Sequence, residues 1–183
     1  VTLRKGARWV EFETKINNNV PNHYLQAAFP TDVDAEFVYA QGQFDVVKRP
    51  IAKPDYSKYD EIPMTEQPMN SFVDICNENE GAAILNTGLK AYESDDDYNH
   101  TVYLSLLRCF ELRIYVTPEE QNYSRIENGS QSFGEHTFRY AFMPHKGDWE
   151  DAQVWKAAED FNMEILIGQT APTEHGKIGR AHV

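Results

Sequence analysis

The sequence predicts an all-β fold, an antiparallel β-sandwich with one short helix near the C-terminus. Two observations favour the sandwich: apolar and polar residues alternate along short segments, and Gly, Pro and Asn residues separate these segments. Alternation with period two indicates a half-buried strand, and a series of short strands is typical of sandwiches. A third observation, apolar residues at helical spacing after residue 148, predicts the helix.

The expected strands follow one another along most of the chain. In residues 10–16, Phe12 and Ile16 share an apolar face with two further residues, while Glu13 faces the other way. The same alternation returns in residues 23–29 and ends at a proline. The remaining expected strands are residues 36–39, 43–47, 71–76, 81–85, 89–93, 101–107, 112–116 and 136–143.

Two stretches depart from this pattern. Residues 50–68 contain four prolines and many charges, and they are expected to form a long surface loop with a packed or functional role. Residues 148–161 are expected to form the helix, because Asp148 can cap its first amides and two acidic residues follow in the first turn. The apolar stripe that should pack this helix against a sheet consists of Ala152, Trp155, Ala158 and Phe161.

The domain organisation is expected to be simple. The chain has 183 residues, enough for one domain with its own hydrophobic core. Residues 1–177 are predicted to be a single β-sandwich segment. Residues 178–183 are predicted to be a tail, either a linker or an appended extension.

Composition excludes several classes of partner. Seventeen basic residues against 29 acidic ones give a formal charge of −12, which repels nucleic acids and anionic membrane surfaces. No apolar stretch is long enough to span a membrane and no secretion signal is present, so the expected location is the cytoplasm. Cys76 and Cys109 lie in apolar runs without metal-ligand spacing, and both are expected to be buried free thiols.

No motif marks a catalytic or metal site in this chain. A nucleophile elbow, an HExxH helix and a calcium loop are all missing, and no pair of carboxyl groups stands out as a glycosidase pair. A metal site formed by His136 and His145 is the weaker alternative. His136 shares an alternating face with Phe138 and Tyr140, which favours a packed histidine.

One charged residue falls on an apolar face. Period two places Arg108 on the same side of its strand as Val102, Leu104 and Leu106. A buried guanidinium needs a partner, because an unpaired buried charge is very costly. Two interpretations stay open: an internal salt bridge, or a sheet-edge arginine that offers its donors to sugar hydroxyls or a carboxylate in a shared cleft.

Several motifs in order resemble those of bacterial family 38 α-mannosidases. They include PMNSFVD at residues 68–74, GAAILNTGL at 81–89 and LSLLR at 104–108. Further matches are QSFGEH, FRYAF and PHKGDW between residues 131 and 149. LQAAFP at 25–30 and the Arg49-Pro50 pair also match, although Gln26 and Lys48 replace commoner residues. The matches extend from about residue 8 to residue 165.

The resemblance implies a piece of a larger retaining α-mannosidase. In the family, the nucleophile and the zinc ligands belong to an N-terminal catalytic domain, so this segment should hold no catalytic residue and no metal. It would form part of a C-terminal super-sandwich, similar to galactose mutarotase, that walls the active-site cleft. Partners would be the catalytic domain and a mannoside substrate, such as mannosylglycerate or its 6-phosphate in the bacterial subgroup.

The resemblance also implies candidate substrate-binding residues. Arg108 matches an arginine that related mannosidases turn toward the cleft, and Gln131 and His136 are weaker candidates for which packing is favoured. Two other functions remain open. One is a carbohydrate-binding module that uses exposed aromatics such as Trp9 or Tyr103, and the other is an interaction domain whose sheet edges pair with another subunit, giving a homo-oligomer.

Overall fold

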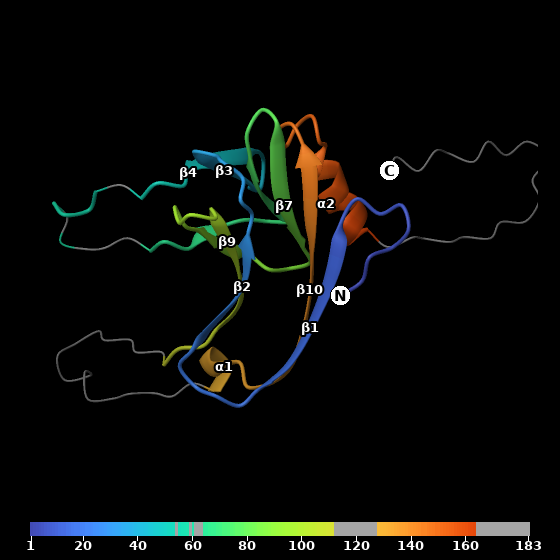
Figure 1. The fold of residues 1–183 in the computed structure, drawn as a ribbon. Coiled ribbons are helices and arrows are strands. Elements are labelled where there is room, and N and C mark those ends of the chain that lie inside the picture. The colour runs from blue at the N-terminus through green and yellow to red at the C-terminus, as the bar shows by residue number, and fades with distance from the viewer. Residues whose placement is uncertain (54, 59, 61–63, 112–127, 164–183) are drawn as a thin grey trace, which may run out of the picture.

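Two antiparallel sheets pack face to face in the computed structural model, which describes residues 1–53, 55–58, 60, 64–111 and 128–163 (Figure 1). The six-stranded sheet has the order β1-β10-β7-β6-β3-β4, and the four-stranded sheet has the order β2-β9-β8-β5. The strands of the first sheet are β1 Val10–Asn18, β10 Gly134–Lys146, β7 Glu80–Asn86, β6 Phe72–Cys76, β3 Phe37–Gln41 and β4 Val46–Pro50. Those of the second are β2 Tyr24–Pro30, β9 Thr101–Arg108, β8 Ala91–Ser94 and β5 Gln67–Pro68. The predicted all-β sandwich is confirmed.

The main core lies between the two sheets. β1 and β10 pair in register, so that Phe12 lies opposite Tyr140 and their rings stack with centroids 5.5 Å apart. Phe29 of the other sheet meets both rings edge-on at 5.9 Å. The alternation expected for residues 10–16 and 23–29 is therefore the pattern that brings these aromatic side chains together.

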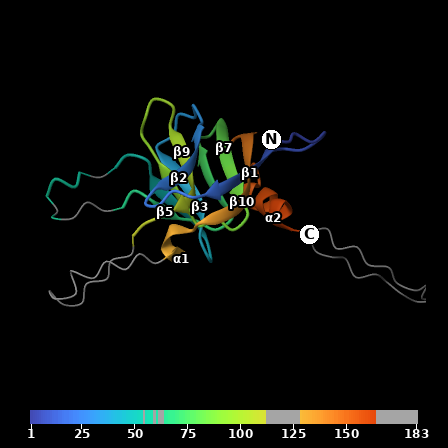
Figure 2. The ribbon, with the colours of Figure 1, turned by 90° about the horizontal axis from the view of Figure 1, so that it is seen from below.

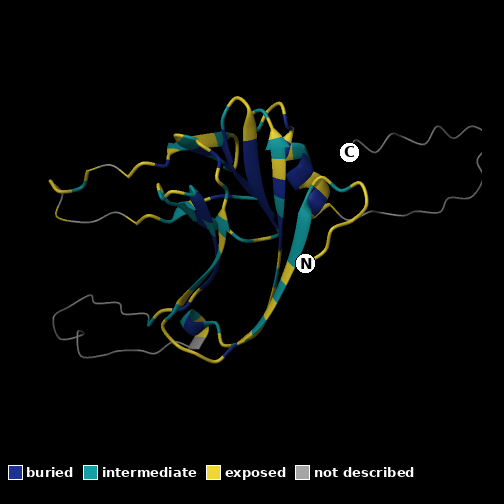
Figure 3. Ribbon diagram, viewed as in Figure 1, coloured by how far each residue is buried: buried dark blue, intermediate teal, exposed yellow. Residues whose placement is uncertain are grey.

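The central strands of the larger sheet are buried on both faces (Figure 3). In β6, Val73 and Ile75 belong to the core between the sheets, whereas Phe72 faces the helix layer. That second layer is α2, Val154–Asn162, which covers the outer face of the six-stranded sheet, away from β2 and β9 (Figures 1 and 2). The expected helix near the C-terminus is thus present, and it packs against a sheet as predicted.

The start of this helix and one of its packing residues differ from the prediction. Asp148 accepts hydrogen bonds from the amides of Glu150 and Asp151, but it caps a turn, and α2 begins six residues later. Trp155 is 42% exposed and was wrongly assigned to the apolar stripe. The residues of α2 that are buried are Val154, Ala157, Ala158 and Phe161.

The remaining segments agree with most expectations. β4 begins three residues later than expected, because the Gly42 amide bonds to the Asp45 carbonyl at 2.7 Å and residues 42–45 form the turn. Both cysteines are free and buried, as predicted. No helix in the described residues is long and apolar enough to cross a membrane. The expected strand at 112–116 and the tail at 178–183 lie outside the described residues.

Candidate functional site

A β-bulge in β9 decides where Arg108 points. Gln26 pairs with Ser105 and Leu25 pairs with Leu107, so Leu106 is an extra residue on β9. An extra residue reverses the alternation beyond it, because the side-chain period of a strand is two. Arg108 therefore lies on the side of Ser105, and its side chain is 55% exposed. The prediction that it shares the apolar face of Val102, Leu104 and Leu106 is wrong.

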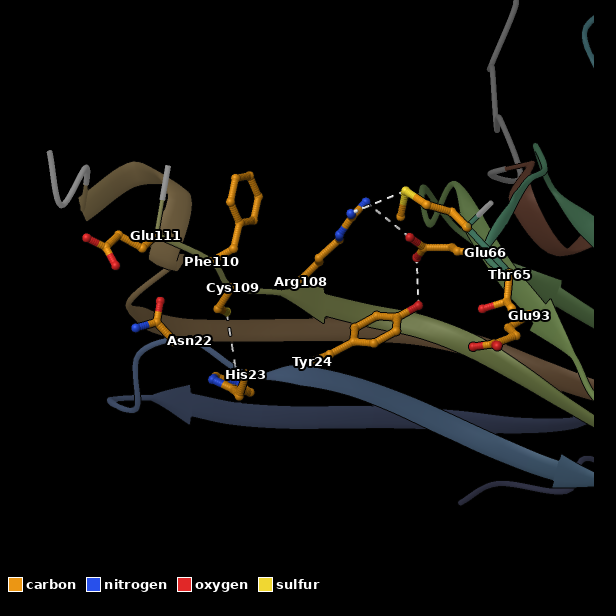
Figure 4. A pocket seen from close by; sticks show the side chains of 11 residues that line it. Asn22, His23, Tyr24, Thr65, Glu66, Glu93, Arg108, Cys109, Phe110 and Glu111 are labelled. Carbon is orange, nitrogen blue, oxygen red and sulfur yellow. Dashed lines mark hydrogen bonds and ion pairs between the residues drawn. The ribbon is translucent and has the colours of Figure 1, made fainter. Parts of the chain in front are cut away.

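Glu66 holds the groups on this outer face together. Its Oε1 accepts hydrogen bonds from the Tyr24 hydroxyl at 2.7 Å and from Ser105 Oγ at 2.6 Å. Its Oε2 accepts one from an Arg108 guanidinium nitrogen at 3.2 Å. The Glu66 side chain is only 11% exposed, so a loop carboxylate is fixed against the sheet by three donors; Figure 4 shows the contacts with Tyr24 and Arg108. Arg108 consequently has the salt bridge that a guanidinium in this setting needs.

These groups line an open pocket of about 700 Å³. Residues 22–24 form one side, residues 64–66 of the proline-rich segment form another, and residues 108–111 follow the end of β9, with Glu93 of β8 between them (Figure 4). Glu66, near the end of the segment 50–68, completes the pocket wall, and the role expected for the whole segment stays a prediction. The end of β9 is also tied to α1, Asn128–Gln131, since the Phe110 amide donates to the Ser130 carbonyl at 3.2 Å.

The electrostatics of the pocket are acidic. Glu66, Glu93 and Glu111 line it together with Arg108. Burial, followed by hydrogen bonding to Glu66 and the charges of Glu66 and Glu93, raises the pKa of Tyr24 to about 12, although the Ser105 hydroxyl acts in the opposite direction. Tyr24 is therefore a neutral hydrogen-bond donor at neutral pH. Among the described residues, no three His, Cys, Asp or Glu side chains come together in a way that could hold a metal ion.

Gln131 and His136 lie near this pocket but do not line it. Gln131 is 1% exposed; its Oε1 accepts from the Asn22 amide at 2.8 Å and its Nε2 donates to Asn22 Oδ1 at 2.9 Å. It thus braces the segment from which Asn22 enters the pocket wall. His136 pairs through Nε2 with the Ser132 carbonyl at 2.7 Å and stacks on Phe138. Both arrangements are packing interactions, and a substrate role for either residue stays a prediction.

A family model described as the glycosyl hydrolases family 38 C-terminal domain matches residues 1–111. The chain belongs to this family. It is 29% identical over 174 residues, 93% of its length, to a protein of Halalkalibacterium halodurans with the provisional name mannosylglycerate hydrolase. It is 28% identical over 166 residues, 91% of its length, to the Homo sapiens protein named alpha-mannosidase 2C1.

The family 38 domain is also similar to a solved structure. A crystal structure of an alpha-mannosidase from Enterococcus faecalis aligns with 85% of this chain at a TM-score of 0.69 and 27% identity. The chain spans only a small share of each relative: 18% and 14% of the two proteins, and 16% of the crystallised chain.

Three motifs of this family 38 domain meet in a buried polar cluster on the outer face of the six-stranded sheet. His145 Nε2 lies 2.8 Å from Asp74 Oδ1, and their side chains are 4% and 0% exposed. The imidazole reaches Asp74 across β7, where residue 81 is glycine. A Cβ at Gly81 would lie 2.6 Å from Cys76 Cβ and closer still to His145 Cε1. Asp74, Gly81 and His145 come from the motifs PMNSFVD, GAAILNTGL and PHKGDW, so these motifs meet in one packing arrangement.

The electrostatics of this cluster depend on the contact between His145 and Asp74. Burial alone would lower the pKa of His145, but the hydrogen bond and the negative charge of Asp74 outweigh it and raise that pKa above its ordinary value. Burial and the charge of Asp74 raise the pKa of the Cys76 thiol. Cys76 is therefore an inert thiol at neutral pH, because the thiolate is the reactive form.

Sequence reasoning missed Glu66, Tyr24 and Ser105. The available signals were weak: Glu66 lies in a segment whose composition predicts a loop, and Tyr24 and Ser105 lie on the polar faces of their strands. Their meeting depends on the bulge at Leu106 and on the path of residues 64–66, and neither is encoded in local periodicity.

Proposed function

We propose that this chain is a non-catalytic β-domain that walls the active-site cleft of an α-mannosidase and contacts the substrate through the pocket at Arg108. The observation that carries the proposal is the open pocket in which Arg108, Glu66 and Tyr24 are held by mutual hydrogen bonds. Fixed hydroxyl, carboxylate and guanidinium groups are suited to hydrogen bonding with sugar hydroxyls. The names of the relatives, which are mannosidases and a mannosylglycerate hydrolase, support the substrate class.

The chemistry itself belongs to the N-terminal catalytic domain in this proposal. That domain would supply the zinc ion, the nucleophile and the acid/base carboxyl of a retaining hydrolysis of α-mannosides. No step of the reaction is assigned to this chain in the proposal. Its own residues bind and orient: Arg108 donates hydrogen bonds, and Glu66 fixes Arg108 and Tyr24 in place. The free state of Cys76 and Cys109 supports a cytoplasmic enzyme.

The alternative of a carbohydrate-binding module gains no support from the aromatic residues first considered for it. Trp9 packs edge-on against Phe161 of α2 with ring centroids 6.1 Å apart. Tyr103 lies on β9, in the other sheet. The two residues therefore do not form one contiguous platform.

The proposal is tested with the full-length protein and the 183-residue chain side by side. The full-length protein should contain zinc and hydrolyse an aryl α-mannoside, and the 183-residue chain should do neither. Arg108→Ala in the full-length protein should lower kcat/KM about tenfold or more, since a hydrogen bond from a charged group contributes about 1.5–3 kcal/mol. Zinc content should stay the same.

Arg4→Ala is the matched control, because Arg4 is an exposed arginine that also pairs with a glutamate, Glu11, at 3.5 Å. It should leave kcat/KM unchanged. Stoichiometric zinc or hydrolysis by the 183-residue chain would contradict the non-catalytic assignment. Equal activity of the Arg108→Ala variant and the native protein would contradict the role of the pocket.

A further inference from the structure

The positive charge of Arg108 is already paired with a carboxylate within this pocket. Arg108 donates to Glu66 at 3.2 Å, and a second guanidinium nitrogen lies 3.7 Å from Met64 Sδ. Glu66 in turn is held by the hydroxyls of Tyr24 and Ser105. An anionic ligand that sought Arg108 would have to displace a carboxylate that three donors hold, or lie directly beside it. Arg108 therefore cannot act as an anion anchor while Glu66 is charged.

The rest of the lining strengthens this effect. Glu93 adds a second carboxylate to the lining, beside Glu66. Lys53 offsets Glu93 only in part, because its Nζ lies 3.9 Å from Glu93 but 3.1 Å from Asp95. The raised pKa of Tyr24 reports the same negative field, since the charges of both Glu66 and Glu93 contribute to it after burial.

Part of the surface left for a ligand is apolar. Tyr24, Met64 and Phe110 line the pocket and are exposed, so an aromatic or thioether face is available for the C–H surface of a sugar ring. The guanidinium N–H groups of Arg108 that Glu66 does not use can donate to neutral hydroxyl groups. A neutral hydroxyl group can accept these hydrogen bonds. The neighbouring carboxylates repel it much less than they repel an anion.

We propose that this pocket selects an uncharged mannoside and rejects sugars that carry a carboxylate or a phosphate, with Glu66 as the rejecting group. The proposal rests on the proposed function, in which the pocket contacts the substrate. It assigns to this chain a specificity different from that suggested by the name of the Halalkalibacterium halodurans relative, since mannosylglycerate carries a carboxylate. Discrimination by a repulsive group is a general route to specificity.

The test compares a matched pair of substrates in the full-length protein, 4-nitrophenyl α-mannoside and its 6-phosphate. We expect kcat/KM to be at least about tenfold higher for the neutral substrate. Glu66→Gln should narrow that ratio about fivefold or more, because it removes the repulsion and frees Arg108. Salt should also narrow the ratio for the native protein, because it screens charges at an exposed site.

Glu13→Gln is the matched control: it is the same substitution at an exposed glutamate of β1, which pairs with Lys15 at 2.9 Å, and it should leave the ratio unchanged. Glu93→Gln gives a second measure of the same effect if Glu66→Gln unfolds the protein. Preference for the phosphate, or a ratio that neither pocket variant changes, would overturn the proposal.

If the full-length protein hydrolyses no α-mannoside, the proposed function is wrong. That result alone does not decide the specificity proposal. Binding of methyl α-mannoside and its 6-phosphate, measured by calorimetry, then decides the specificity. Methyl α-mannoside should bind more tightly than its 6-phosphate, and Glu66→Gln should reduce the difference between the two Kd values. This result supports the rejecting role of Glu66. Failure to bind either probe, or a preference for the phosphate, refutes it.

Discussion

The Asp74–His145 pair shows how strongly a single position depends on its surroundings. Both side chains are buried, and among the described residues Asp74 Oδ2 and His145 Nδ1 find no hydrogen-bond partner. The pair is therefore sensitive to any change in its charge, because a buried ionic group that loses its partner is strongly destabilising.

This sensitivity predicts a pH-dependent stability. The pKa of His145 is raised in the folded state, so the stabilisation from the pair is fully present below the ordinary histidine pKa of about 6.5 and is lost as pH rises through the folded value. His145→Gln should lower the free energy of unfolding by about 3–5 kcal/mol near pH 6 and by less at higher pH. Urea denaturation of the 183-residue chain across this range measures the difference.

His136→Gln is the control, because His136 bonds to a backbone carbonyl, not to a carboxylate. The loss of unfolding free energy caused by His136→Gln should not become smaller as pH rises, in contrast to the loss caused by His145→Gln. A His145→Gln effect that is constant with pH would show that the proton on His145 does not contribute to folding.

At this scale, sequence reasoning identified Arg108 but mistook its surroundings. Arg108 does have a carboxylate partner, Glu66, but the contact lies on the exposed outer face and is not the internal salt bridge considered from the sequence, and whether Arg108 faces a substrate cleft stays a prediction. The face on which Arg108 lies could not be predicted, because Leu106 and Leu107 are equally apolar and the sequence carries no mark of which one is the extra residue. Glu66 was missed because a loop residue has no periodicity to read.

At the scale of elements, α2 shows which apolar side chains hold a layer in place. Phe161 is buried against the outer face of the six-stranded sheet, edge-on to Trp9, with the Arg139 guanidinium 4.6 Å from its ring centre. Trp155, six residues earlier in the helix, is 42% exposed. The two aromatic residues of α2 therefore contribute very unequally.

Phe161→Ala should lower the free energy of unfolding by about 3–5 kcal/mol, because it leaves a cavity beneath the helix. Trp155→Ala is the matched control and should cost less than about 1 kcal/mol, as is usual for exposed positions. Denaturant titration of both variants checks this. Equal losses in the two variants would mean that α2 packs with its other face.

The helix boundary was mispredicted for a physical reason. Asp148 does accept two backbone amides, as a helix cap would, but the same hydrogen bonds close an isolated turn. The α-helix then starts after Gln153, which has a left-handed backbone with φ of 50°. Trp155 was assigned to the buried side for a different reason: a spacing of three residues is shorter than the 3.6 residues of a helical turn, so Trp155, six residues before Phe161, lies roughly 120° around the helix from it.

For the whole molecule, alternation predicted the sandwich but not its strand order. β10 inserts between β1 and β7, which are more than sixty residues apart in sequence. Such long-range pairing leaves no local trace in the sequence. Within the described residues, β1, β4, β2 and β5 lie at the edges of the two sheets, and association of copies through these edges stays a prediction.

The net charge of −12 predicts that salt stabilises this chain. Excess like charge destabilises a compact state through repulsion, and about 0.2 M salt reduces the range of that repulsion to below about 10 Å. The Tm should therefore rise by a few degrees between low salt and about 0.2 M sodium chloride. Potassium chloride should act equally, because screening is not specific to the ion. A fall in Tm would mean that surface ion pairs such as Lys53–Asp95 outweigh the repulsion.

The missing side chain at Gly81 has a consequence for the history of the family. The space above its Cα is occupied by the His145 ring, which uses it to reach a carboxylate two strands away. A mutation that adds a methyl group at position 81 can be tolerated only if position 145 changes with it, and Asp74 then loses its partner. Across the family, positions 74, 81 and 145 should therefore be conserved together and substituted together, although they are distant in sequence.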